Sequence, residues 1–144
     1  MAVWIGALAG FAFVFAPLAF HTVTNVAQFA RLVAASIHAL TLLGLVCGAI
    51  AVAMALVRGR SSAQRWSSPA RALLIAAAVG FAAYDAYAIV PHMEHLVPRT
   101  AAYRALHDAS SRLYGGALLL ATVALVLAVL DGRIGAKEKP RHAS

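Results

Sequence analysis

Asp85 is the residue of this chain with the clearest chemical potential, because it is the only formally charged residue inside four long apolar segments. A charged side chain at the centre of a bilayer costs at least about 2.5–3.5 kcal/mol unless protein shelters it. His38 lies in another of these segments at a matching depth. By helical rise, Asp85 is roughly 8 Å and His38 roughly 9 Å from the same predicted membrane boundary. We therefore predict a His38–Asp85 pair in which each polar group satisfies the other.

A second polar set begins shortly before the last apolar segment. Tyr103, His107, Ser110 and Tyr114 follow one another at spacings of four, three and four residues, which places them on one face of a helix. Together with the first set they predict a polar cup that opens to the outside and that binds or passes a small polar solute, a proton or a metal ion. The candidate residues are Asp85, His38, His107 and Ser110, framed by Tyr84, Tyr87 and Tyr103.

Candidate metal ligands follow the third apolar segment. His92, Glu94 and His95 place two imidazoles and a carboxylate within four residues, and these groups suit zinc, copper or iron. Haem is a separate option, for which His38 and His107 form the only pair at a suitable depth. The alternative for all these polar residues is that they only fix the register of the helices.

The four apolar segments must position these side chains. About 20 apolar residues cross a bilayer as a helix. Of the 144 residues, 62% are hydrophobic and 12% are charged, whereas soluble domains have roughly 45–50% and 25%. The sequence therefore predicts an all-α membrane protein, an up-down bundle of four transmembrane helices that forms a single domain over residues 1–144. The expected spans are approximately 2–20, 32–57, 72–90 and 113–130.

The ends of these segments carry signals of their own. Pro98 followed by Thr100 is a helix-start signal, so we expect the fourth helix to begin near residue 100. Pro91 lacks an N–H and clashes with the preceding turn, so we expect a kink or a stop in the third helix. The basic stretch 131–144, which contains glycines and a proline, is expected to be a flexible tail.

The basic residues predict the orientation. Eight of the twelve lysines and arginines fall on one predicted side of the membrane, and basic segments stay in the cytoplasm during insertion. We expect cytoplasmic N- and C-termini and a multi-pass protein of the plasma (inner) membrane. The expected partner is the lipid bilayer, and nucleic acid is not expected. The eight residues are Arg58, Arg60, Arg65, Arg71, Arg133, Lys137, Lys139 and Arg141.

Glycines recur at four-residue spacing, as Gly6 and Gly10 and again as Gly44 and Gly48. Small residues at this spacing let the backbones of membrane helices approach closely. The pattern fits tight packing within the bundle and equally fits a homo-oligomer, and it does not choose between them.

Landmarks in the first helix are Trp4-Ile-Gly6, the run Phe11-Ala-Phe-Val-Phe-Ala-Pro17, and Phe20; Pro91, Arg99 and Leu106-His107-Asp-Ala-Ser110 lead into the fourth. Over the whole chain, this order resembles the small membrane proteins related to transmembrane protein 205, which share a domain of unknown function. The resemblance implies a four-helix membrane protein without assigned enzymatic activity, with His107 and Ser110 as shared polar positions. His92, Glu94 and His95 do not match the pattern of that family.

The residues themselves also argue against catalysis. Ser110 follows His107 by three residues, but no complete nucleophile–base arrangement is present, so we expect that the protein is not an enzyme. Two other classes stay open. One is a structural or assembly protein that engages another membrane protein, and the other is a haem-dependent electron carrier.

Overall fold

A computed structural model describes residues 1–23, 25–58, 67–97 and 100–137 of the chain. The regular elements within these ranges are all helical. Two of them, η1 and η3, are short π-helical segments that continue directly into α-helices on both sides. In chain order the elements are α1 (Ala2–Gly10), η1 (Phe11–Phe15), α2 (Ala16–Thr22), α3 (Val26–Arg58), α4 (Ser67–Tyr84), η3 (Asp85–Ile89), α5 (Val90–Glu94) and α6 (Ala101–Lys137).

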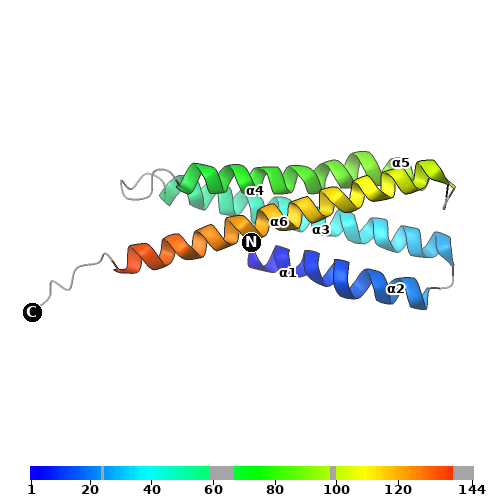
Figure 1. Ribbon diagram of the computed structural model, residues 1–144, viewed down its shortest axis with the longest axis horizontal. Helices are drawn as coiled ribbons and strands as arrows, with labels where there is room; N and C mark the ends of the chain where they lie inside the picture. The colour runs from blue at the N-terminus through cyan, green and yellow to red at the C-terminus, as the bar shows by residue number, and fades with distance from the viewer. Residues whose placement is uncertain (24, 59–66, 98–99, 138–144) are drawn as a thin grey trace, which may run out of the picture.

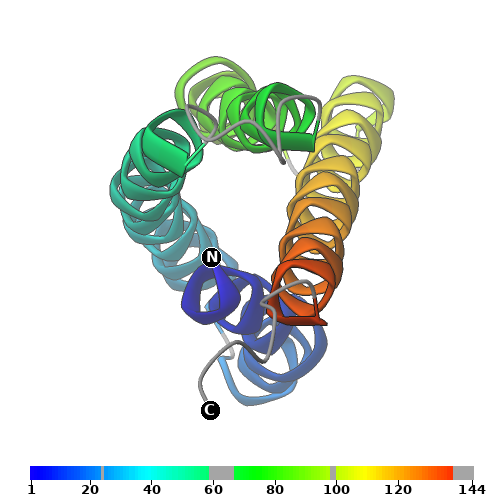
Figure 2. The same ribbon diagram turned by 90° about the vertical axis from the view of Figure 1, so that its left-hand side faces the viewer.

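These elements form four long helices, each long and apolar enough to cross a membrane. The first helix comprises α1, η1 and α2, the second is α3, the third comprises α4, η3 and α5, and the fourth is α6. Each runs antiparallel to the next one in the chain (Figure 1). Viewed from its end, the molecule is a ring in the order α1, α3, α4, α6 (Figure 2). The predicted up-down bundle of four membrane-length helices is confirmed.

Both π-helical segments end two residues before a proline, Pro17 in the first helix and Pro91 in the third. Proline has no N–H to donate, and its ring clashes with the carbonyl four residues earlier. A π turn contains an extra residue, and such local adjustments let membrane helices tolerate proline. The third helix therefore continues through Pro91 to Glu94 and does not stop at the proline.

Trp4 anchors the first helix in the core of the bundle. Its side chain is fully buried, and its indole Nε1 donates a hydrogen bond of 2.9 Å to the carbonyl oxygen of Leu40 on α3. One turn further along α3, a Cβ on Gly44 would lie only 2.5 Å from Cε2 of Trp4. The indole occupies the space of a side chain, so this position requires glycine.

The two glycine pairs serve different purposes. A Cβ on Gly48 would lie 2.7 Å from Val79 Cγ2 of α4, so Gly48, like Gly44, allows close helix packing within the chain. A Cβ on Gly6 or on Gly10, by contrast, would meet no neighbouring atom within 4 Å. The second pair is therefore used inside the bundle, and the first pair lies on an uncovered part of the first helix.

The fourth helix extends beyond its apolar window at both ends. It begins at Ala101, close to the predicted start, and continues to Lys137. Residues 131–137 of the predicted flexible tail thus continue α6 as a helix, and an ion pair between Asp131 and Arg71 joins α6 to α4. Residues 138–144 of that tail and residues 59–66, between the second and third predicted spans, lie outside the described residues.

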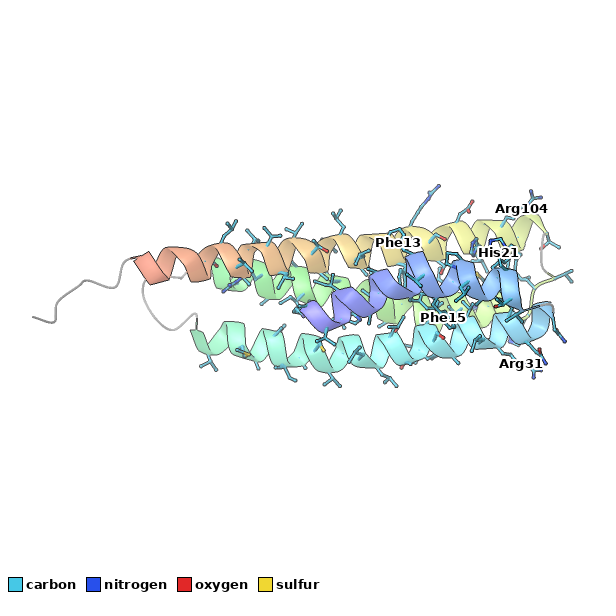
Figure 3. All side chains as sticks on the ribbon, turned by 90° about the horizontal axis from the view of Figure 1, so that it is seen from below. Phe13, Phe15, His21, Arg31 and Arg104 are labelled. Atoms are coloured by element: carbon cyan, nitrogen blue, oxygen red, sulfur yellow. The ribbon has the colours of Figure 1, made fainter. Side chains whose placement is uncertain are left out.

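The first helix is shorter than its neighbours, so the bundle has two unlike halves. Met1 lies near the middle of the bundle, and α1 and α2 run from there to one end (Figure 1). We name this four-helix part the Asp85 half; its end carries His21, Arg31 and Arg104 (Figure 3). The remaining part, the Arg71 half, is formed by α3, α4 and α6 within the described ranges.

Candidate functional site

Asp85 lies inside the bundle, at the first residue of η3, and only 1% of its surface is exposed. The buried residues Ala78, Ala82, Asp85 and Ile89 follow one another at spacings of four, three and four. This is the period of one helical face. The helical period by itself therefore turns the carboxylate toward the protein interior and away from lipid.

Polar side chains of α6 face Asp85. The side chains of Ser110, which is 8% exposed, and of His107 are near enough to the carboxylate to interact with it electrostatically. Tyr114 is close enough to interact electrostatically with Asp85, and its hydroxyl donates a hydrogen bond of 3.5 Å to the carbonyl oxygen of Leu8. The structure thus brings Asp85, His107 and Ser110 together. Tyr114 is an additional site residue, and its place four residues after Ser110 is the sequence signal that indicates it.

The carboxylate of Asp85 is not fully satisfied by these neighbours. Neither of its oxygens accepts a hydrogen bond of regular geometry from the described residues. A buried ionised carboxylate without a hydrogen-bonded partner is costly, so the site favours uptake of a positive charge. A hydroxyl, an imidazole and a phenol beside a carboxylate can together bind and exchange a proton.

The predicted His38–Asp85 pair does not form. Nδ1 of His38 lies 2.9 Å from the carbonyl oxygen of Ala34, and the imidazole meets the ring of Tyr87 edge-on at 5.5 Å. His38 lies at the depth of Asp85 along the bundle, since its neighbour Tyr87 is only two residues from Asp85. The side chain of His38 does not point toward Asp85, because the buried face of α3 passes through Ala34 and Ile37. His38, one residue later, is rotated by about 100° from that face.

The predicted aromatic frame is also only partly present. Tyr84 is 59% exposed and Tyr87 is 56% exposed. They do not frame the carboxylate, because positions one residue before and two residues after Asp85 point to other sides of the helix. Tyr103 stacks on His107 of the same helix, with ring centroids 6.2 Å apart and ring planes at 8°. It therefore belongs to the α6 side of the site.

The candidate metal ligands His92, Glu94 and His95 do not converge. Within the described ranges, no group of three His, Cys, Asp or Glu side chains could hold a metal ion. All three residues are exposed, and Nδ1 of His92 lies 2.6 Å from the carbonyl oxygen of Ala88. The helix α5 ends at Glu94, and His95 is its C-cap residue.

A second polar contact joins α4 to α6 in the Arg71 half. Nη1 of Arg71 lies 3.1 Å from Oδ2 of Asp131, and the Arg71 side chain is 9% exposed. The sequence patterns count Arg71 among the basic residues that predict the orientation and assign Asp131 to a flexible tail, and so miss their contact. The signal that indicates it is a pair of opposite charges at the adjoining ends of two antiparallel apolar segments.

The comparison with protein families identifies the chain. Residues 1–102 match the family described as a domain of unknown function (DUF4149). The chain belongs to this family. No curated protein and no solved structure matches the chain.

Membership of the DUF4149 family agrees with the expected kind of protein, a small membrane protein without assigned activity. The match does not name transmembrane protein 205, so it supports only the coarser part of that resemblance. The part of the chain that matches contains Asp85, whereas His107, Ser110 and Tyr114 follow it. The DUF4149 family thus covers the carboxylate of the site and not its partners on α6.

Proposed function

We propose that this DUF4149 protein binds a proton at Asp85 and passes it, alone or together with a small polar solute, through the Asp85 half of the bundle. The observation that carries the proposal is a carboxylate that is 1% exposed and whose oxygens accept no regular hydrogen bond from the described residues. We propose no enzymatic role for the site.

The neighbouring side chains suit this role. A hydroxyl such as that of Ser110 donates to an ionised carboxylate and accepts from a protonated one, so it serves both states of Asp85. His107 is exposed, and histidine is the side chain that most readily exchanges protons near neutral pH. A proton can therefore reach Asp85 from the end of the bundle by way of His107 and Ser110. Tyr114 continues the polar line from Ser110 toward Leu8 of the first helix.

Proton flux into liposomes tests the proposal. The full chain is reconstituted with a pH-sensitive dye inside, and a pH gradient is imposed together with a potassium-clamped membrane potential. We expect faster decay of the gradient than in protein-free liposomes, and a return to the protein-free rate in Asp85→Asn. Ser110→Ala should slow the decay several-fold.

Asp108→Asn is the matched control, because Asp108 is an exposed carboxylate on the same helix as Ser110. This variant should retain the flux of the unsubstituted protein. Equal flux through the unsubstituted protein and Asp85→Asn would overturn the proposal. Infrared spectroscopy of the same samples gives a second measurement, since the signal of a protonated carboxyl group should disappear in Asp85→Asn and persist in Asp108→Asn.

The orientation and the membrane also belong to the proposal. We place the Asp85 half on the outer side of the plasma membrane and both termini in the cytoplasm. The support is the excess of basic residues on the predicted cytoplasmic side. Eight are counted there, and seven remain when Arg71 is left out because Asp131 neutralises it. A fluorescent reporter fused to the C-terminus should fold and fluoresce in the cytoplasm. We also propose closer kinship with the proteins related to transmembrane protein 205, on the landmarks of the first helix and of Leu106 to Ser110.

Assembly with a second membrane chain is the alternative function, and the first helix favours it. Gly6 and Gly10 leave open space above their backbones, and Phe13 on the same helix is 75% exposed. Close approach of another helix along such a stripe is a common mode of association in membranes. Under this alternative, Gly6→Leu and Gly10→Leu would abolish cross-linking between copies of the chain. Asp85→Asn would change neither the cross-linking nor the proton flux.

A further inference from the structure

The Arg71 half contains a cavity that the proposed function does not use. Its volume is about 150 Å³, and it lies beyond the start of α1, between α3, α4 and α6. Its walls include Met54 of α3, Ile75 of α4 and Leu125 of α6. Met1 borders the cavity at the start of α1, and Arg71 is the side chain of its lining that carries a charge. The cavity is therefore apolar over most of its surface and has one cationic end.

The cationic end has unused hydrogen-bonding capacity. The Arg71 side chain is about nine-tenths buried and contacts Asp131 through Nη1, but its Nε has no hydrogen-bond partner among the described residues. Oδ2 of Asp131 likewise accepts no hydrogen bond of regular geometry within them. Both members of the ion pair can therefore bind a further polar group, an acceptor at Arg71 and a donor at Asp131.

The position of the pair matches the headgroup region of a bilayer. The third apolar span begins at Pro69 and the fourth ends at Asp131, so Arg71 and Asp131 lie at the boundary of the hydrocarbon. Ile75 is one helical turn deeper than Arg71, about 6 Å along α4. Leu125 is six residues deeper than Asp131, about 9 Å along α6. A molecule with a polar head at the pair can extend an apolar chain into the cavity.

The charge of the pair selects the kind of head. Arg71 and Asp131 together are neutral, so a purely anionic head would leave a net negative charge at the membrane boundary. A zwitterionic head complements both members: its phosphate accepts from Nε of Arg71, and its ammonium faces Asp131. A primary ammonium has three N–H donors for the carboxylate, whereas a quaternary ammonium has none.

We propose that the Arg71 half binds a phospholipid of the phosphatidylethanolamine type. The phosphate lies on Arg71, the primary ammonium lies on Asp131, and the first part of one acyl chain fills the cavity beside Ile75 and Leu125. A cavity of this size holds several methylene groups, comparable to a benzene-sized ligand in an apolar protein cavity.

Retention of lipid by the purified full chain tests this proposal. The protein is exchanged into micelles that contain equal amounts of phosphatidylethanolamine, phosphatidylcholine and phosphatidylglycerol with identical acyl chains, and retained lipid is identified by native mass spectrometry. Phosphatidylethanolamine should be retained at least threefold over each of the other two. Equal retention of all three, or a preference for phosphatidylglycerol, would overturn the proposal.

Variants separate the head from the chain. Ala128 lines the cavity and Ala76 is exposed on α4, so Ala128→Leu fills the cavity while Ala76→Leu is the matched control. Ala128→Leu should lose the retained lipid, and Ala76→Leu should keep it. Should Ala128→Leu not fold, Ala51→Leu fills the same cavity from α3. Retention that is unchanged in the folded cavity variant would contradict the proposal.

Two further experiments test how the headgroup is bound. Arg71→Lys keeps a positive charge near Asp131 but removes the Nε donor, so the preference for phosphatidylethanolamine should fall at least threefold while the helical content stays constant. Millimolar inorganic phosphate should not displace the lipid, since it lacks the apolar chain. Displacement by phosphate alone would show a simple anion site and would overturn the assignment to a phospholipid. None of these outcomes depends on proton flux through Asp85.

Discussion

The two halves of the bundle treat a buried charge in opposite ways. In the Asp85 half a carboxylate that is 1% exposed faces a hydroxyl, an imidazole and a phenol, and no positive side chain is paired with it in the described structure. In the Arg71 half the guanidinium lies 3.1 Å from the carboxylate of Asp131. An ion pair offsets much of the desolvation of its members, whereas a single charge needs a proton or a bound cation. The comparison supports our proposal that proton exchange takes place in the Asp85 half.

The two halves also differ in how many helices surround their polar groups. The first helix covers the Asp85 half, where Trp4, Leu8 and Tyr114 close the core. Beyond Met1, a cavity of about 150 Å³ remains between the other three helices. The better-covered half contains the unpaired charge, and the open half contains the neutral pair. This difference is consistent with separate roles, proton exchange in the first and lipid binding in the second.

The largest expected effect concerns the ion pair. Arg71→Ala or Asp131→Ala leaves one charge without its partner, and loss of one member of a buried pair typically costs 3–5 kcal/mol. Because the Asp131 side chain is 19% exposed, we expect a loss of roughly 2–4 kcal/mol in the free energy of unfolding. Titration of mixed micelles with a denaturing detergent measures it. The double variant should recover part of this loss, and single variants as stable as the unsubstituted protein would remove the structural role of the pair.

The next effect concerns the helix contact at the junction of the two halves. Gly44→Ala places a methyl group against the buried indole of Trp4, so we expect a destabilisation of roughly 1–3 kcal/mol from overpacking. Gly6→Ala is the matched control, because its added methyl meets nothing within 4 Å. That variant should unfold like the unsubstituted protein or be slightly more stable, since alanine favours helix. Equal effects of the two substitutions would contradict the described contact between α1 and α3.

A smaller effect of opposite sign is expected at Asp85. Asp85→Asn removes an ionisable group that lacks a regular hydrogen bond, so the free energy of unfolding should rise by about 1 kcal/mol. Asp108→Asn, on the exposed side of α6, should change it by less than about 0.5 kcal/mol. The same detergent titration applies. A marked loss of stability in Asp85→Asn would assign the carboxylate a structural role like that of Asp131.

The smallest effect concerns a buried hydrogen bond between α3 and α4. Oγ1 of Thr41 donates to the carbonyl oxygen of Ala82 at 3.3 Å, and Thr41 is 3% exposed. Thr41→Val keeps the shape and removes the donor, so we expect a loss of about 0.5–1 kcal/mol. Thr122, whose hydroxyl bonds within its own helix to Leu118, is the control, and Thr122→Val should have almost no effect. An unchanged stability of Thr41→Val would mean that this bond adds nothing to helix association.

Helical period explains which parts of the site were predictable. The spacing predicts one side of α6 for Tyr103, His107, Ser110 and Tyr114, and two members of this set, His107 and Ser110, interact with Asp85. The depth argument predicts that His38 and Asp85 lie level, and His38 contacts Tyr87, two residues from Asp85. Depth alone could not say which way His38 points. The buried positions Ala34 and Ile37 show that it lies off the inner face. The positions of the small and apolar residues show which face of each helix is buried. This face, and not the depth of the polar residues, indicates which side chains can meet Asp85.

Composition and segment length determine the class of fold. Four apolar stretches of membrane length in one short chain favour a helical bundle, because every backbone polar group in hydrocarbon must be satisfied within its own helix. The relative rotation and sliding of those helices came only from packing. Trp4 against Gly44 sets the first helix, and the π turns before Pro17 and Pro91 change the angle at which later residues emerge. These contacts join residues far apart in the chain, so local sequence could place Arg71 and Asp131 at helix ends but could not reveal that they meet.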